Sequence, residues 1–127
     1  MASAGGGDCL TGLNISGSNF LGIYNNTVYL NGASSSAIFG SSAFYATTSN
    51  QVLDLRNNIF VNTSTPNGTG ITAAIRFTNS SWSNGLSLLS NNNALYAGTP
   101  GLSNVLFTDV TNKDQTLVAF QSRVYPR

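Results

Sequence analysis

The chain contains no histidine, no glutamate and a single cysteine in its 127 residues. Without histidine it has no imidazole for general-base catalysis or haem ligation, and it cannot form the usual zinc sites and catalytic triads. Cys9 cannot form an internal disulfide, because it has no partner. It is predicted to be a small residue at the start of the first strand; the alternative is an intermolecular bridge or a lipid attachment beside the glycine run 5–7. We therefore expect no catalytic residue, no cofactor and no metal.

Charge is also scarce. Only 7% of the residues are charged, against about 25% in typical soluble domains. The five basic residues are scattered, whereas a nucleic-acid-binding protein carries a dense basic patch, so nucleic acid is not expected as a partner. No apolar run reaches the roughly 20 residues of a membrane span. At 41% hydrophobic residues the chain is too apolar for a disordered protein, and its many Asn, Ser, Thr and Gly residues suit strands and corners.

Three segments of the sequence repeat one another. They begin at Asn26, Asn57 and Asn92, about 31 and 35 residues apart, and each continues from an Asn-containing polar pair into three apolar or aromatic residues. A short apolar strand is predicted before each one, over 21–23, 52–55 and 86–89. Self-similarity at a period of 20–50 residues indicates a repeat architecture.

Stacking of the repeats would bury apolar faces that a single repeat leaves exposed. Aligning the three segments places Val28, Ile59 and Ala94 in one inward row. The next row contains Leu30, Val61 and Tyr96. Asparagine tolerates the left-handed backbone of a sharp corner, and its amide can bond to the same amide in the next repeat. The predicted corner residues are Asn25, Asn26, Asn57, Asn58, Asn92 and Asn93.

Further elements are predicted around these repeats. Strands are expected over 10–15, 36–46, 71–78 and 105–107. A short helix is expected over 116–124, because Leu117, Phe120 and Val124 have the spacing of one helix face. Asn112 and Gln115 resemble a capping box before it, and Asp114 is expected as a favourable charge in its first turn.

The segment 53–62 resembles the coils of right-handed parallel β-helix proteins, the pectate-lyase-like solenoids. Residues 90–98 and 114–121 resemble a module of large secreted or surface bacterial β-helix proteins, often exported by the type IX route. The resemblance implies an all-β, right-handed parallel β-helix of about three coils with a short C-terminal amphipathic helix. It also implies a secreted or cell-surface bacterial location. We expect a flexible segment over 1–9 and one β-helix domain over 10–127, a fragment or minimal version of a longer solenoid.

The carboxylates do not form a recognisable catalytic pair. Glycoside hydrolysis typically uses two facing carboxylates, and this chain has four, Asp8, Asp54, Asp109 and Asp114. No acid occupies the positions that match Asp54 in the other repeats, and Asp109 and Asp114 belong to the C-terminal loop and the predicted helix start. Asp54 and Arg56 lie on the same face of one predicted strand. A surface ion pair is the favoured interpretation, and a catalytic remnant is the alternative.

These observations favour a structural protein without enzymatic activity: a stalk, adhesin or filament subunit that self-associates by end-to-end coil stacking. The alternative is a carbohydrate-binding module with a polysaccharide partner, and a polysaccharide lyase or hydrolase remnant ranks third. The aromatic residues predicted to contact a glycan are Tyr24, Tyr29, Tyr45, Trp82 and Tyr96.

Overall fold

The computed structural model describes residues 9–17, 20–47, 52–80 and 85–124, and in these ranges the chain forms ten short strands and one helix. The predicted flexible segment 1–9 lies outside the described residues except for Cys9, and Trp82 also lies outside them.

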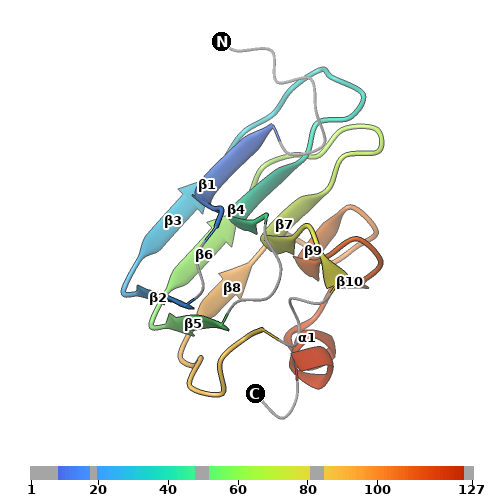
Figure 1. Ribbon diagram of the computed structural model, residues 1–127. Helices are drawn as coiled ribbons and strands as arrows, with labels where there is room; N and C mark the ends of the chain where they lie inside the picture. Colours follow the sequence, from blue (N-terminus) through green and yellow to red (C-terminus); the bar gives the residue numbers. More distant parts are fainter. Residues whose placement is uncertain (1–8, 18–19, 48–51, 81–84, 125–127) are drawn as a thin grey trace.

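The strands form three sheets (Figure 1). Sheet A has the order β1 (Leu10–Ile15), β4 (Ser41–Ala46), β7 (Thr72–Phe77), β9 (Asn104–Thr108) and β10 (Lys113–Asp114). Sheet B contains β2 (Phe20–Tyr24) and β5 (Val52–Arg56). Sheet C has the order β3 (Thr27–Leu30), β6 (Ile59–Asn62) and β8 (Ala94–Tyr96).

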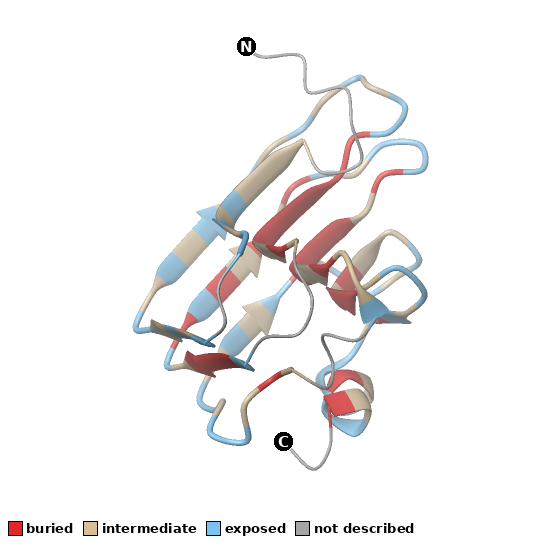
Figure 2. Ribbon diagram, viewed as in Figure 1, coloured by how far each residue is buried: buried red, intermediate tan, exposed pale blue. Residues whose placement is uncertain are grey.

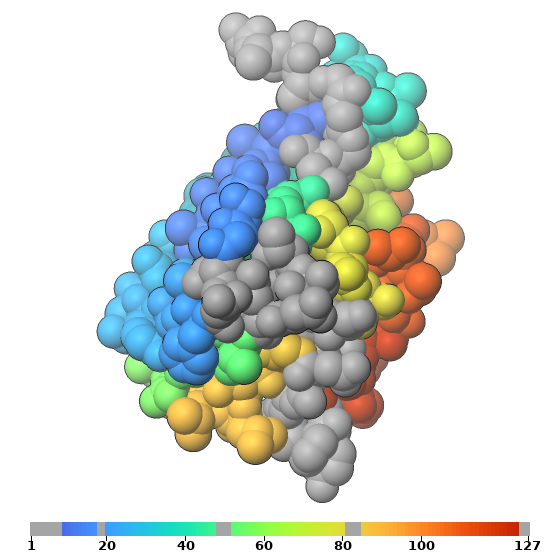
Figure 3. All heavy atoms as spheres, viewed as in Figure 1, coloured from blue at the N-terminus to red at the C-terminus, as the bar shows by residue number. Residues whose placement is uncertain are grey.

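Each repeat lies beside the next. The strands pair in parallel from one repeat to the following one in all three sheets, and among the described strands only β10 pairs antiparallel, with β9. In Figure 3 the residues coloured blue, near the N-terminus, and those coloured red, near the C-terminus, accordingly lie on opposite sides of the molecule.

The predicted fold class, a right-handed parallel β-helix of about three coils, is wrong. The structure instead consists of three short sheets with five, two and three strands, and the largest sheet is mixed rather than parallel. The parallel pairing of the repeated segments was predicted correctly, but the repeats do not build a regular set of coils.

Two local turns account for this difference. The strand expected over 86–89 is replaced by a turn, in which the Leu89 N–H donates to Ser87 Oγ and the Ser90 N–H donates to the Ser87 carbonyl. Such local bonds compete with strand pairing, so sheet B stops at two strands. At the other end, Asp109 Oδ1 accepts the N–H groups of Thr111 and Asn112, and this turn reverses the chain into the antiparallel β10.

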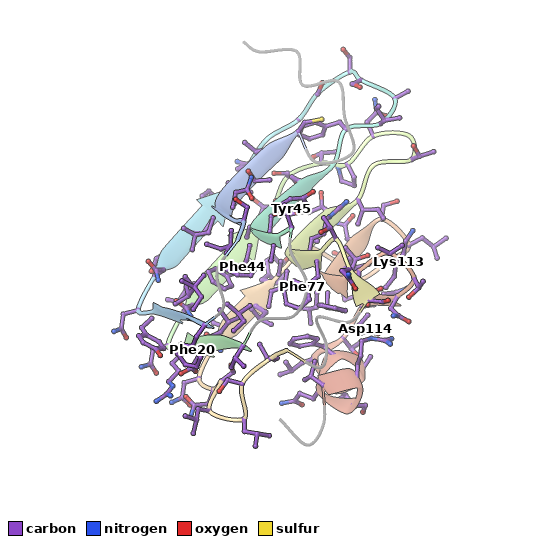
Figure 4. All side chains as sticks on the ribbon, in the orientation of Figure 1. Phe20, Phe44, Tyr45, Phe77, Lys113 and Asp114 are labelled. Carbon is purple, nitrogen blue, oxygen red and sulfur yellow. The ribbon has the colours of Figure 1, made fainter. Side chains whose placement is uncertain are left out.

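The core lies between the three sheets and is centred on phenylalanine rings. Phe44 stacks on Phe60 with ring centroids 5.4 Å apart, and Phe77 meets Phe107 edge-on at 5.3 Å. Phe120 of the helix stacks on Phe107 at 5.0 Å, so the aromatic series continues into the C-terminal helix. Figure 2 shows the buried residues concentrated in the middle strands, and Figure 4 shows Phe44 and Phe77 pointing into the interior.

The predicted register of sheet C is wrong by one residue in the first repeat. Val28 pairs with Phe60, which pairs in turn with Leu95, so Val28 is not in the row of Ile59 and Ala94. Tyr29, rather than Leu30, is in the row of Val61 and Tyr96, because it pairs with Val61, which pairs with Tyr96. This row lies on the outer face. The predicted inward position of Ile59 is also wrong, because Ile59 is 44% exposed and Phe60 is fully buried. Successive residues of a strand face opposite sides, so a shift of one residue exchanges the core and solvent faces.

The predicted helix is present as α1 (Leu117–Val124), with Phe120 and Val124 buried. The predicted cap is wrong, because the Ala119 N–H bonds to Thr116 Oγ1 and makes Thr116 the capping residue. Asp114 does not lie in the first turn of the helix. It belongs to β10, where its carboxylate accepts hydrogen bonds from Arg123 Nε and, at 2.7 Å, from Arg123 Nη2.

Candidate assembly surface

The predicted corner asparagines occupy two kinds of position. The first of each pair, at Asn25, Asn57 and Asn92, has a positive φ of 57°, 55° and 54° respectively. Asparagine adopts this left-handed conformation more readily than most residues. Asn25 and Asn57 therefore turn the chain from sheet B into sheet C, and Asn92 turns it from the segment 86–91 into β8.

The second of each pair forms a hydrogen-bonded ladder. Asn58 Oδ1 accepts both the N–H of Asn26, at 3.0 Å, and its Nδ2, at 3.2 Å. Asn93 Oδ1 accepts the same two groups of Asn58, at 3.0 and 2.9 Å. Asn58 is fully buried, and its Nδ2 also donates to the Ile23 carbonyl at 2.8 Å. The ladder thus has a direction, with every rung donating toward the C-terminal repeat.

The two ends of this ladder differ. Asn26 uses its Nδ2 for Asn58 and for the Tyr24 carbonyl, and among the described residues its Oδ1 accepts no hydrogen bond. Asn93 Nδ2 donates to the Leu55 carbonyl. Its second Nδ2 hydrogen and its backbone N–H have no acceptor in the part of the chain that the structure describes. One end of the ladder therefore offers an acceptor, and the other offers donors.

The strands β1, β2 and β3 lie at one side of the molecule (Figure 1). Each is the first strand of its sheet, and no described strand pairs with its outer side. We call these three outer sides the N-terminal edge. Six core side chains beside it are only half-buried, whereas their neighbours Phe44, Leu53 and Phe60 in the next repeat are fully buried. The six are Leu13, Ile15, Leu21, Ile23, Val28 and Leu30.

The opposite end is partly covered. Helix α1 closes the core there through Phe120 and Val124, and β10 lies along β9. Strand β8 keeps an outer side with which no described strand pairs. A cleft of about 170 Å³ lies between α1 and the segment 90–95. It is smaller than the roughly 300–1,000 Å³ of typical small-molecule sites, so it is not a built ligand pocket.

Tyr24, Asp54 and Arg56 form a polar cluster on sheet B. Arg56 donates to the Asp54 carboxylate through Nε at 2.9 Å and Nη2 at 2.6 Å, and the Tyr24 hydroxyl donates at 2.8 Å. The tyrosine ring lies over Gly22, where a side chain would overlap it, so the absence of a Cβ lets the hydroxyl reach Asp54. The Asp54–Arg56 ion pair was predicted from sequence, whereas the contribution of Gly22 and Tyr24 was not.

Hydrogen bonds from Arg56 hold the pKa of Asp54 below its ordinary value, against the opposing effect of burial. The hydrogen bond to Asp54 in turn raises the pKa of Tyr24. A carboxyl group whose pKa is lower in the folded state stabilises the fold above its unfolded pKa. That stability is lost as the pH falls through the folded value.

This cluster predicts an acid-dependent loss of stability. The free energy of unfolding of the wild-type chain should fall as the pH drops from about 5 to about 2, and that of Asp54→Asn should fall less, because its amide does not titrate. Urea denaturation at a series of pH values measures both slopes. Asp109, whose pKa is also lowered, leaves a residual slope: burial raises that pKa, but hydrogen bonds from Asn112 and Thr111 outweigh it. Equal slopes in the two proteins would contradict the role given to Asp54.

The other two described carboxylates also have structural contacts. Asp109 holds the turn before β10, and Asp114 pairs with Arg123. No group of three or more His, Cys, Asp or Glu side chains occurs among the described residues. The three described carboxylates are thus each engaged in a separate local network.

The four described residues among the predicted glycan contacts come from three different sheets. Tyr24 belongs to sheet B and Tyr45 to sheet A, while Tyr29 and Tyr96 lie in one row of sheet C, 61% and 50% exposed, with Val61 between them. The carbohydrate-binding alternative therefore keeps Tyr29 and Tyr96 as its candidate pair, and no further observation favours it. Cys9 is half-buried beside β1, with its N–H bonded to the Gly40 carbonyl.

Comparison with protein-family models, with curated proteins and with solved structures finds no match to this chain. Among the described residues, no helix has the length and apolar character that a membrane span requires.

Proposed function

We propose that this chain is a structural module of an extracellular or cell-surface protein, of the stalk, adhesin or filament kind, that self-associates through its N-terminal edge. The observation that carries the proposal is the open side shared by β1, β2 and β3. The extracellular setting rests on the sequence resemblance.

Unpaired strand edges bind other strands readily, and soluble proteins normally protect them with charged side chains, proline or a covering element. The N-terminal edge has none of the charges, because residues 9–53 include no Asp, Glu, Lys or Arg. Strands of another copy, placed against this edge, would complete the burial of the six half-buried core side chains beside it. Backbone pairing and apolar burial therefore favour association at the same surface.

The pairing register of β3 with β6 shows which backbone groups of β3 face away from β6 and could bind another strand. Ile59 N–H bonds to the Asn26 carbonyl, and Thr63 N–H bonds to the Leu30 carbonyl, so the even-numbered residues of β3 face β6. Alternate residues of a strand direct their backbone groups to opposite sides. The backbone groups of Thr27 and Tyr29 therefore face outward.

Tyr29→Pro should weaken self-association at least about tenfold relative to Tyr29→Ala, because proline removes an outward N–H and obstructs strand approach. The alanine variant is the matched control, since it also lacks the phenol but keeps the N–H. Sedimentation equilibrium on both variants and the wild type measures the difference. A wild-type chain that stays a 13.3 kDa monomer at tens of micromolar would contradict the proposal.

A further inference from the structure

We infer that the surface that binds the N-terminal edge is the β8 side of a second copy, so that the chains join head to tail and the asparagine ladder continues from Asn93 of one copy to Asn26 of the next. This inference rests on the proposed function and specifies its partner and register. It combines three observations: the direction of the ladder, the backbone register of sheet C, and the unequal ends of the molecule.

The ladder distinguishes head-to-tail contact from contact between two N-terminal edges. Asn26 already uses both Nδ2 hydrogens, and only its Oδ1 remains without a partner among the described residues. Two such edges would bring acceptor against acceptor. Asn93 has an N–H and one Nδ2 hydrogen to donate, the same two groups that Asn26 and Asn58 donate within the chain. A head-to-tail contact therefore repeats an existing rung.

The backbone of β8 fits the same arrangement. Ala94 N–H bonds to the Asn58 carbonyl, so Ala94 and Tyr96 face β6 and Leu95 faces outward. Thr27 of an incoming β3 would then bond on either side of Ala94, which extends the row Thr27–Ile59–Ala94 into the next molecule. The strand register between two copies would thus be the same as the register between successive repeats in sheet C.

Exposed apolar side chains also occur in two segments near the C-terminal end of the molecule, one of which, α1, forms a cleft with Leu95 of β8. Leu88 and Leu89 are exposed in the turn before it, and Leu117 and Val118 are exposed on α1. They offer an apolar surface to the half-buried side chains of the N-terminal edge of the incoming copy. Because the two joined surfaces differ, each added copy leaves both ends available, and such a contact yields an open chain of molecules.

Thiol cross-linking tests the register. In a Cys9→Ser background, the double variant Thr27→Cys/Ala94→Cys places one thiol on each joined strand at exposed positions. Within one molecule these positions are separated by two strand spacings, about 9.6 Å, which exceeds the roughly 7 Å limit between the Cα atoms of a disulfide. Between copies they would be adjacent. Mild oxidation should therefore give a series of covalent dimers, trimers and longer multimers on a non-reducing gel.

Matched variants separate the alternatives. Thr27→Cys/Tyr96→Cys, out of register by two residues, should cross-link at least about fivefold more slowly, because its thiols are about 8 Å apart. Mixing the single variants Thr27→Cys and Ala94→Cys should give dimers only. Dimers of Thr27→Cys alone would show contact between two N-terminal edges and overturn the inference. Association without cross-linking of the double variant would overturn it while leaving the proposed function intact, whereas a monomeric wild-type chain would overturn both.

Discussion

Phe60→Ala should lower the free energy of unfolding by about 3–5 kcal/mol, the usual range for removing a large buried aromatic side chain. The ring is fully buried and stacks on Phe44 at a centroid distance of 5.4 Å. Its loss would leave a cavity in the middle repeat, between the strands that precede and follow it. Urea denaturation monitored by circular dichroism measures the effect.

The neighbouring residue provides the matched control. Ile59→Ala should change the same free energy by less than about 1 kcal/mol, because the side chain is 44% exposed on the outer face. The two substitutions are adjacent in β6, so they share backbone and strand context. A larger loss for Ile59→Ala than for Phe60→Ala would show that β6 has the opposite face inward.

The sequence pattern predicted the wrong pairing register between β3 and β6, and the reason can be identified. When the repeats are aligned on the first polar residue of each segment, Asn26 matches Asn57. The structure matches Asn26 with Asn58, one residue later, because the ladder joins the second asparagine of each pair. Both alignments place an asparagine opposite an asparagine, so the sequence alone does not distinguish them, and only the ladder bonds fix the register.

Local sequence patterns predicted the individual strands and the helix better than they predicted how the strands combine into sheets. The strand at Leu10–Ile15 and the helix that buries Phe120 follow from alternation and helical spacing within a few residues. The turn at Ser87 and the reversal at Asp109 depend on side-chain bonds to nearby backbone. The apolar run at 86–89 is typical of a strand, so the turn at Ser87 was not predicted. The two residues of β10 have no strand pattern, so the reversal at Asp109 was not predicted either. These two turns decide how many strands each sheet contains, which explains why the elements were predicted and the fold class was not.

The sequence predicted the asparagines of the ladder as corner residues, but it did not predict that Asn58 contributes most to stability. The Asn58 side chain makes four hydrogen bonds to three residues: it accepts from the N–H and Nδ2 of Asn26, and it donates to the Ile23 carbonyl and to Asn93 Oδ1. It is fully buried, whereas Asn26 at the end of the ladder is half-buried. Water can replace lost bonds at Asn26 more easily than at Asn58.

Asn58→Ala should therefore lower the free energy of unfolding by about 2–4 kcal/mol, because each buried group left without a partner costs about 1–3 kcal/mol. Asn26→Ala, the control at the ladder end, should cost about 1 kcal/mol or less.

Asn58→Asp keeps the acceptor but points a carboxylate at the Ile23 carbonyl and Asn93 Oδ1, so it should destabilise at least as much as alanine near neutral pH. Protonation restores one donor, and the loss for Asn58→Asp should shrink as the pH falls below the pKa of the new carboxyl group. Equal stabilities for Asn58→Asp and the wild type at neutral pH would mean that the amide nitrogen does not donate along the ladder, and the direction on which head-to-tail joining depends would be lost.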